Sequence, residues 1–159
     1  MSSSHHKSSG FSLIELLVSI VIIMLLVSGA MASYTSFIEK QRLVTAAEKL
    51  ESGLREAQNM AKIGYLGTCD ELREIRFLTS NSGTGVRYRT QVFCADATNN
   101  SLGYVYLADD LSISPQIDIS FRPYDNLASG ITVVLSSTRS NNAATFDIDK
   151  GGSIKVTYN

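Results

Sequence analysis

Glu15 is the residue of this sequence whose setting most requires a chemical partner. It stands near the start of an apolar run that extends from Phe11 to Met31. A helix of this length spans roughly one hydrocarbon core of about 30 Å. An ionised carboxylate near the centre of such a segment costs about 2.5–3.5 kcal/mol. We therefore expect a cationic partner for Glu15.

The segment Gly10-Phe11-Ser12-Leu13-Ile14-Glu15-Leu16-Leu17 resembles the prepilin peptidase site of type IV pilins and type II secretion pseudopilins. In that family the peptidase cleaves after the glycine and methylates the new N-terminal amine. A glutamate five residues along the mature chain then pairs with the N-terminal amine of a neighbouring subunit. Carried over by position, the resemblance implies cleavage between Gly10 and Phe11, N-methylation of Phe11, and an assembly salt bridge through Glu15.

The electrostatics of the segment agree with this resemblance. Cleavage would create a cationic amine at Phe11, four residues before Glu15, and opposite charges attract strongly in a low dielectric. In a lone membrane-resident subunit the pair could form only within one chain or with lipid headgroups. In a staggered stack, one chain's amine could meet the next chain's Glu15. The alternative is an ordinary signal anchor in which Glu15 has no specific role.

The chain is expected to contain four segments. Residues 1–10 are predicted to be a cleaved leader, and 11–32 a hydrophobic transmembrane or filament-core helix. Residues 33–63 would continue that helix in amphipathic form, and 64–159 would form a β-rich head. Lys7 on the leader side favours a cytoplasmic N-terminus and an exported remainder.

An apolar stripe marks the amphipathic part of the helix. It recurs at alternating four- and three-residue steps and consists of Leu43, Ala47, Leu50, Leu54, Ala57 and Ala61. We predict one helix from about Ser12 to about Ile63, with Gly29 as a point of bending or local melting and Gly64 as the C-cap. We expect the stripe to pack on the chain's own head rather than form a coiled-coil seam. The segment 54–61 also resembles the corresponding part of the H-type minor pseudopilins.

Alternating apolar residues after Tyr65 predict several short strands. They are expected near 74–78, 86–94, 103–107, 117–121, 131–135, 145–149 and 153–158. Residues 80–85 and 95–101 are expected to be loops, and Lys150-Gly151-Gly152 a hairpin turn. A long helix followed by such strands predicts an α+β domain, the pilin fold, in which a mainly antiparallel sheet packs on the distal half of the helix.

Two cysteines, Cys69 and Cys94, are the only ones in the chain, and both lie in the part predicted to be exported. An even count in such a domain suggests a disulfide, which would contribute about 3–4 kcal/mol in the chain-entropy model. Two free thiols are the alternative. No metal site is expected, because the two cysteine sulfurs would be the only ligands and no histidine lies near them in the sequence.

Catalysis is not expected from this composition. The only histidines, His5 and His6, lie in the predicted leader, so the mature chain lacks Ser-His-Asp and Cys-His arrangements. Gly83-Thr84-Gly85 lacks the lysine and helix of a phosphate-binding loop. We therefore predict no catalytic residue and no cofactor.

Two weaker patterns have plain structural explanations. Asp147 and Asp149 have the alternate spacing of some calcium loops, but the other ligands of an EF-hand are missing. A DNA-binding patch could be formed by Arg73, Arg76, Arg87 and Arg89 with Tyr88 for stacking. Solvated strand positions explain the same arginines, and nothing else in the sequence supports a DNA partner.

The function predicted from these features is a structural subunit, major or minor, of a type IV pilus-like filament. Its partners would be other copies, other pilins, the prepilin peptidase and an inner-membrane assembly platform. The precursor would sit in the cytoplasmic membrane with its head outside, and the mature chain in an extracellular filament. The alternatives are a type II secretion pseudopilin and a single-pass anchored binding protein that never polymerises. With 159 residues and a formal charge of -1, the chain is too balanced in charge to indicate a nucleic-acid partner.

Overall fold

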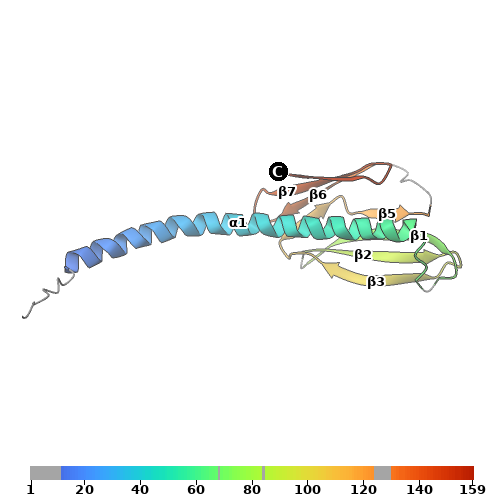
Figure 1. Cartoon of the computed structure of the whole chain (residues 1–159), viewed down its shortest axis with the longest axis horizontal. Helices are drawn as coiled ribbons and strands as arrows, with labels where there is room; N and C mark the ends of the chain where they lie inside the picture. Colours follow the sequence, from blue (N-terminus) through green and yellow to red (C-terminus); the bar gives the residue numbers. More distant parts are fainter. Residues whose placement is uncertain (1–11, 68, 84, 124–129) are drawn as a thin grey trace, which may run out of the picture. The chain divides into compact units, whose positions relative to one another are not determined.

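The computed structural model describes residues 12–67, 69–83, 85–123 and 130–159. In these residues one long helix precedes all the strands (Figure 1). The chain divides into two units, Met1–Ile38 and Glu39–Asn159, and each is described by itself. The predicted α+β class is confirmed.

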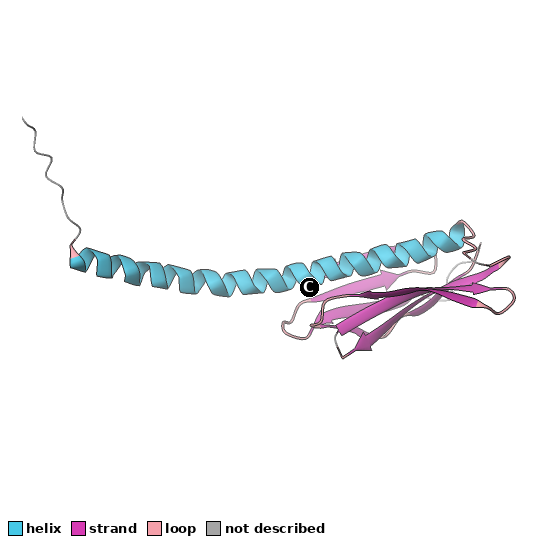
Figure 2. Ribbon diagram, turned by 90° about the horizontal axis from the view of Figure 1, so that it is seen from below, coloured by secondary structure: helices cyan, strands magenta, loops and turns pink. Residues whose placement is uncertain are grey.

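Helix α1 extends over Leu13–Lys62, as the sequence predicted to within a residue or two (Figure 2). The backbone is helical at Gly29, so the local melting expected there does not occur. The helix ends in a Schellman motif around Gly64, which has φ of +66°. In that motif the Tyr65 amide donates to the Met60 carbonyl at 2.8 Å, and the Gly64 amide donates to the Ala61 carbonyl at 3.2 Å. Gly64 is therefore the C-cap that the sequence indicated.

The strands form two four-stranded sheets rather than the single sheet that we expected. The first has the order β3-β2-β1-β5 and the second the order β4-β6-β7-β8, and neighbouring strands in the described residues pair antiparallel. Sheet one contains β1 (Leu72–Ser82), β2 (Gly85–Cys94), β3 (Asn99–Tyr106) and β5 (Asp118–Phe121). Sheet two contains β4 (Leu111–Ser114), β6 (Ile131–Ser137), β7 (Ala143–Ile148) and β8 (Ile154–Tyr158).

Two predicted loops are shorter than expected. Strands β1 and β2 pair as far as Ser82 with Gly85, so the ladder occupies most of the expected 80–85 loop. Strand β3 begins at Asn99, inside the expected 95–101 loop. The β7–β8 hairpin is confirmed, since the Gly152 amide donates to the Asp149 carbonyl at 2.9 Å.

The second half of α1 packs against both sheets. The predicted stripe is buried, with Ala47 and Ala57 fully inaccessible and Leu43, Leu50, Leu54 and Ala61 at most 2% exposed. It shares one core with Phe77 of sheet one and Phe146 of sheet two. A polar contact also joins the helix to the turn between β7 and β8, where the Gln58 side chain donates to the Gly152 carbonyl at 2.9 Å. The interpretation of the stripe as the face that packs on the chain's own head is confirmed.

Side chains of β1 satisfy backbone groups of the segment that carries β4 and leads into β5. The Asn81 amide donates to the Ile113 carbonyl and accepts from the Ile113 amide, each at 3.0 Å. The Thr79 hydroxyl accepts from the Ile117 amide at 2.7 Å. These bonds occupy backbone groups that would otherwise be buried without partners.

Candidate assembly site

The first part of α1 is apolar on all sides. Every leucine, isoleucine, valine and methionine from Leu13 to Val27 is exposed, from 44% for Ile20 to 83% for Leu13. A helix that is apolar all round normally lies in a membrane or inside a larger assembly, because a helix on a protein surface needs only one apolar stripe. The surroundings that suit this segment are therefore not supplied by its own unit.

Hydroxyl groups in this segment are satisfied within the helix. Ser19 donates to the Glu15 carbonyl at 2.7 Å, and Ser28 donates to the Met24 carbonyl at 2.8 Å. Such bonds to the preceding turn remove the need for water around the hydroxyls. The serines are therefore compatible with an apolar environment.

Glu15 is the only charged residue from position 12 to position 38. It lies in the first turn of α1. A negative charge there interacts favourably with the helix dipole, which stabilises the helix by about 0.3–1 kcal/mol at an exposed site. Among the described residues its carboxylate forms no ion pair. The carboxylate is thus placed in an apolar segment without the cation that the sequence led us to expect.

The predicted cleavage point lies outside the described residues. Gly10 and Phe11 belong to residues 1–11, so the expected processing and N-methylation remain predictions. Among the residues that the structure describes, no helical stretch is both long enough and apolar enough to cross a membrane.

Cys69 and Cys94 form the predicted disulfide, with their α carbons 5.4 Å apart. The bond joins the segment that follows α1 to the last residue of β2. Both residues are buried, at 8% and 2% exposure. Next to the bond, the Ala95 amide donates to the Glu71 carbonyl at 3.0 Å. A closed loop with a sequence separation of 25 contributes about 3.5 kcal/mol in the chain-entropy model.

The four arginines considered for DNA binding do not act together with Tyr88. Tyr88 points to the core, where its ring stacks on Phe77 with 5.1 Å between centroids. Arg76 lies near Glu74 and Asp118 at 3.6 and 3.7 Å. The idea that Tyr88 is available for stacking is therefore wrong.

Arg87 and Arg89 instead flank Tyr104, a residue that the sequence analysis did not select. Their guanidinium carbons lie 4.4 and 5.2 Å from the centre of the Tyr104 ring. The β2–β3 register places Arg89 opposite Tyr104 and Arg87 opposite Tyr106. Cross-strand register was the missing information, because local alternation gives the face of each residue but not its neighbour on the next strand.

The acids considered for calcium belong to a hairpin. Asp147 accepts a hydrogen bond from the Thr132 hydroxyl at 2.7 Å, and Asp149 accepts one from the Ser153 amide at 2.7 Å. In the described part of the chain, no group of three or more candidate metal ligands occurs. The plain hairpin interpretation accounts for both carboxylates.

Comparison with known proteins gives one match. Residues 5–31 match the prokaryotic N-terminal methylation motif. No curated protein and no solved structure matches the chain. The match covers the glycine, the aromatic residue, the acid and the apolar run on which the sequence prediction was based.

Proposed function

We propose that the protein is a structural subunit of a type IV pilus-like filament. The proposal starts from the N-terminal methylation motif at residues 5–31, the processing site of type IV pilins and pseudopilins. In the proposal the chain is a pilin-type structural protein and not an enzyme. In the proposal the prepilin peptidase cleaves after Gly10 and methylates Phe11. Residues 11–32 hold the precursor in the cytoplasmic membrane and later form the filament core.

The observation that carries the proposal is the Glu15 carboxylate, which forms no ion pair among the described residues and lies on a helix segment that is apolar on all sides. Processing would create the nearest cation, an amine at Phe11. At 4 Å and an effective dielectric of 20, two such charges attract by about 4 kcal/mol. Pairing between copies would satisfy both charges and fix the axial position of each subunit on the next.

The apolar side chains provide contact area between subunits but do not fix the orientation or axial register of one subunit on the next. They leave lipid for equivalent helices, so the transfer is from one apolar environment to another and its driving force is modest. Direction and register must therefore come from a polar group. Glu15 is the only charged side chain at positions 12–38 that can supply it.

Assembly of a Glu15→Leu variant tests the proposal. We expect normal cleavage and methylation, shown by intact mass and N-terminal sequencing of membrane protein, together with a loss of sheared surface filaments of about tenfold or more. Glu39→Leu is the matched control, because it removes an acid from the same helix outside the apolar run. Its assembly should remain normal.

Two outcomes would contradict the proposal. Normal filaments from Glu15→Leu would remove the pairing mechanism, and a native chain that still begins at Met1 would remove processing. The second result would leave an anchored protein that does not polymerise. An export defect on deletion, without surface filaments at native expression, would assign the same subunit to a secretion pseudopilus.

A further inference from the structure

The outer face of sheet one carries an arginine–tyrosine patch, defined here as Arg87, Arg89, Tyr104 and Tyr106. Val86 and Val92, on either side of the two arginines in β2, are buried in the core, so the arginines at the alternate positions project from the opposite face. Tyr104 and Tyr106 are 43% and 57% exposed, with 6.5 Å between their ring centroids. The patch is thus an exposed aromatic surface with two cations.

The patch lacks acidic partners among the described residues. Arg76 and Arg122 of the same unit each lie within 3.6 Å of a Glu74 oxygen, whereas Arg87 and Arg89 form no ion pair. The Arg87 Nε donates to the Ser80 hydroxyl at 3.0 Å, and a guanidinium has five N–H donors, so a cation–π contact with Tyr104 still leaves donors for a carboxylate. Tyrosine and arginine are also the residue types enriched at the centres of protein interfaces.

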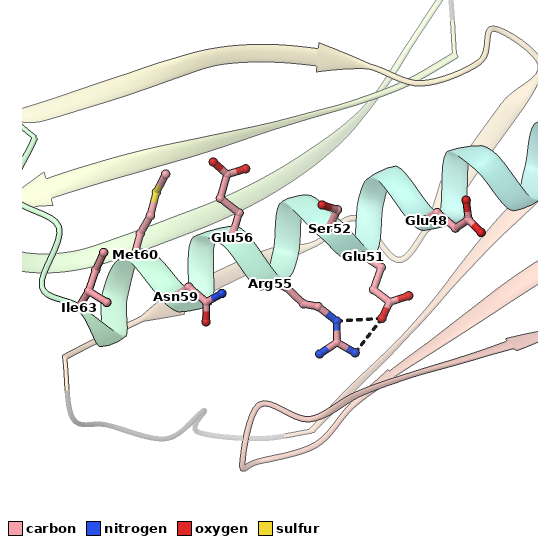
Figure 3. Close-up of a pocket in the computed structure, with 8 residues that line it drawn as sticks. All are labelled: Glu48, Glu51, Ser52, Arg55, Glu56, Asn59, Met60 and Ile63. Atoms are coloured by element: carbon pink, nitrogen blue, oxygen red, sulfur yellow. Dashed lines mark hydrogen bonds and ion pairs between the residues drawn. The ribbon is translucent and has the colours of Figure 1, made fainter.

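A groove on the exposed side of α1 has the complementary character (Figure 3). Its volume is about 690 Å³, and its lining includes three glutamates, Glu48, Glu51 and Glu56. Glu51 already holds Arg55 at 2.7 Å, but Glu48 and Glu56 have no ion pair in the described residues. Met60 and the 76% exposed Ile63 give the groove an apolar end.

We propose that the arginine–tyrosine patch of one copy docks into the α1 groove of the next copy. Arg87 and Arg89 would face Glu48 and Glu56, and the tyrosines would cover Met60 and Ile63. Within one copy the surfaces cannot meet, because the patch lies on the sheet face turned away from the core that includes α1. This inference rests on the proposed function, since it assigns a contact between heads in the proposed filament.

The contact joins two different surfaces, which is what a filament requires. An interface that uses unlike surfaces on the two partners leaves one of each free at the ends and can repeat without closing. A nucleic acid would also suit the two arginines. The formal charge of -1 for the whole chain favours a protein partner over a polyanion.

Charge reversal in the full-length chain, expressed at its native level, tests the docking. Arg87→Glu with Arg89→Glu makes the patch acidic, and Glu48→Lys with Glu56→Lys makes the groove basic. Because like charges would then face each other, we expect each chain alone to give filaments reduced by about tenfold or more. Co-expression of the two chains should restore assembly, since an acidic patch can then meet a basic groove and a native patch a native groove.

Matched controls exclude effects of net charge and folding. Lys150→Glu with Lys155→Glu, and Asp70→Lys with Glu71→Lys, make the same charge changes at exposed positions outside both surfaces. They should assemble normally. Formation of the Cys69–Cys94 disulfide and a normal membrane level of processed subunit would show that each variant folds. Restoration by co-expression could not occur if either variant were simply misfolded.

Three results would overturn the docking. Normal assembly of both reversed chains would show that neither surface matters, and failure of co-expression to restore filaments would show that they do not meet. Binding of a fluorescent single-stranded oligonucleotide by the full chain in detergent, lost in the patch variant, would assign the patch to nucleic acid if co-expression also failed. Any of these results alongside a defective Glu15→Leu would leave the proposed function intact, whereas normal filaments from Glu15→Leu would remove its pairing mechanism.

Discussion

Helix α1 passes through two contrasting environments. From Leu13 to Val27 every large apolar side chain is exposed, while from Leu43 to Ala61 the apolar stripe is at most 2% exposed. The backbone hydrogen bonds are helical in both parts. The difference lies in the side chains, since the first part is apolar all round and the second is apolar on one face only.

This contrast shows which part of the chain completes its own fold. The stripe needs one apolar surface, and the two sheets of the same unit supply it. An all-round apolar helix needs apolar neighbours on every side, which a single small unit does not provide. Stability of the second part is therefore a property of one chain, whereas the first part needs apolar surroundings that its own unit does not supply.

The largest effect that separates the two parts should come from a matched pair of truncations. Phe77→Ala removes a fully buried ring and should lower the free energy of unfolding of the head by about 3–5 kcal/mol. Leu17→Ala changes a residue that is 56% exposed, and it should change that free energy by less than about 0.5 kcal/mol. Denaturant unfolding of the full-length chain in mild detergent, followed by tyrosine fluorescence, measures both. Equal losses would show that the first part shares the core of the head.

Local patterns predicted the parts of the fold that depend on nearby residues. The stripe, the Gly64 cap and the β7–β8 turn each follow from a few positions close in sequence. The disulfide prediction needed only the cysteine count and the expected compartment. Periodicity and turn-forming residues determine these features, so contacts between distant segments did not change the local prediction.

The remaining features depend on contacts between distant segments. Strand β4, only four residues long, was not predicted, because its partner β6 lies about twenty residues later. The division into two sheets depends on which strands pair, and alternation within a strand does not specify that. Tyr104 could not be assigned to Arg87 and Arg89 for the same reason, since the β2–β3 ladder shifts register between Arg89 and Gln91.

A glycine in the buried part of α1 gives a second, smaller test of the contrast. By helix propensity alone, Gly53→Ala would stabilise the helix by about 1 kcal/mol. A β carbon at this position would lie 2.6 Å from a Tyr88 ring atom, and the ring is held against Phe77. We expect a net destabilisation of about 1–3 kcal/mol from overpacking.

Neighbouring changes distinguish the clash from a general effect of alanine. Ser52→Ala, at an exposed position of the same turn, should be neutral or slightly stabilising. Adding Tyr88→Ala should reduce the penalty of Gly53→Ala, and the double-mutant cycle measures that coupling. A stabilised Gly53→Ala would mean that the helix lies farther from β2 than the structure has it.

The smallest expected effect concerns the ionisation of Tyr88, which lies where the buried part of α1 meets β2. Burial raises the pKa of the Tyr88 hydroxyl above its usual value, and the Glu56 carboxylate adds to the shift. The hydroxyl also donates to the Lys49 carbonyl at 3.4 Å. The folded chain therefore keeps this proton at a pH where the unfolded chain has lost it.

The sign of the pH dependence follows from that difference. The contribution is fully present below about pH 10, the unfolded value, and is lost as the pH rises through the folded pKa. Tyr88→Phe cannot ionise, so its free energy of unfolding should fall less steeply with pH above 10 than that of the unmodified chain. Burial raises the pKa of Tyr158 as well, with Glu48 and Glu51 adding to the shift, so part of the slope should persist until Tyr158→Phe is added. Identical slopes with and without the Tyr88 hydroxyl would show that water reaches it freely, and the contact between α1 and β2 would then be looser than the buried stripe implies.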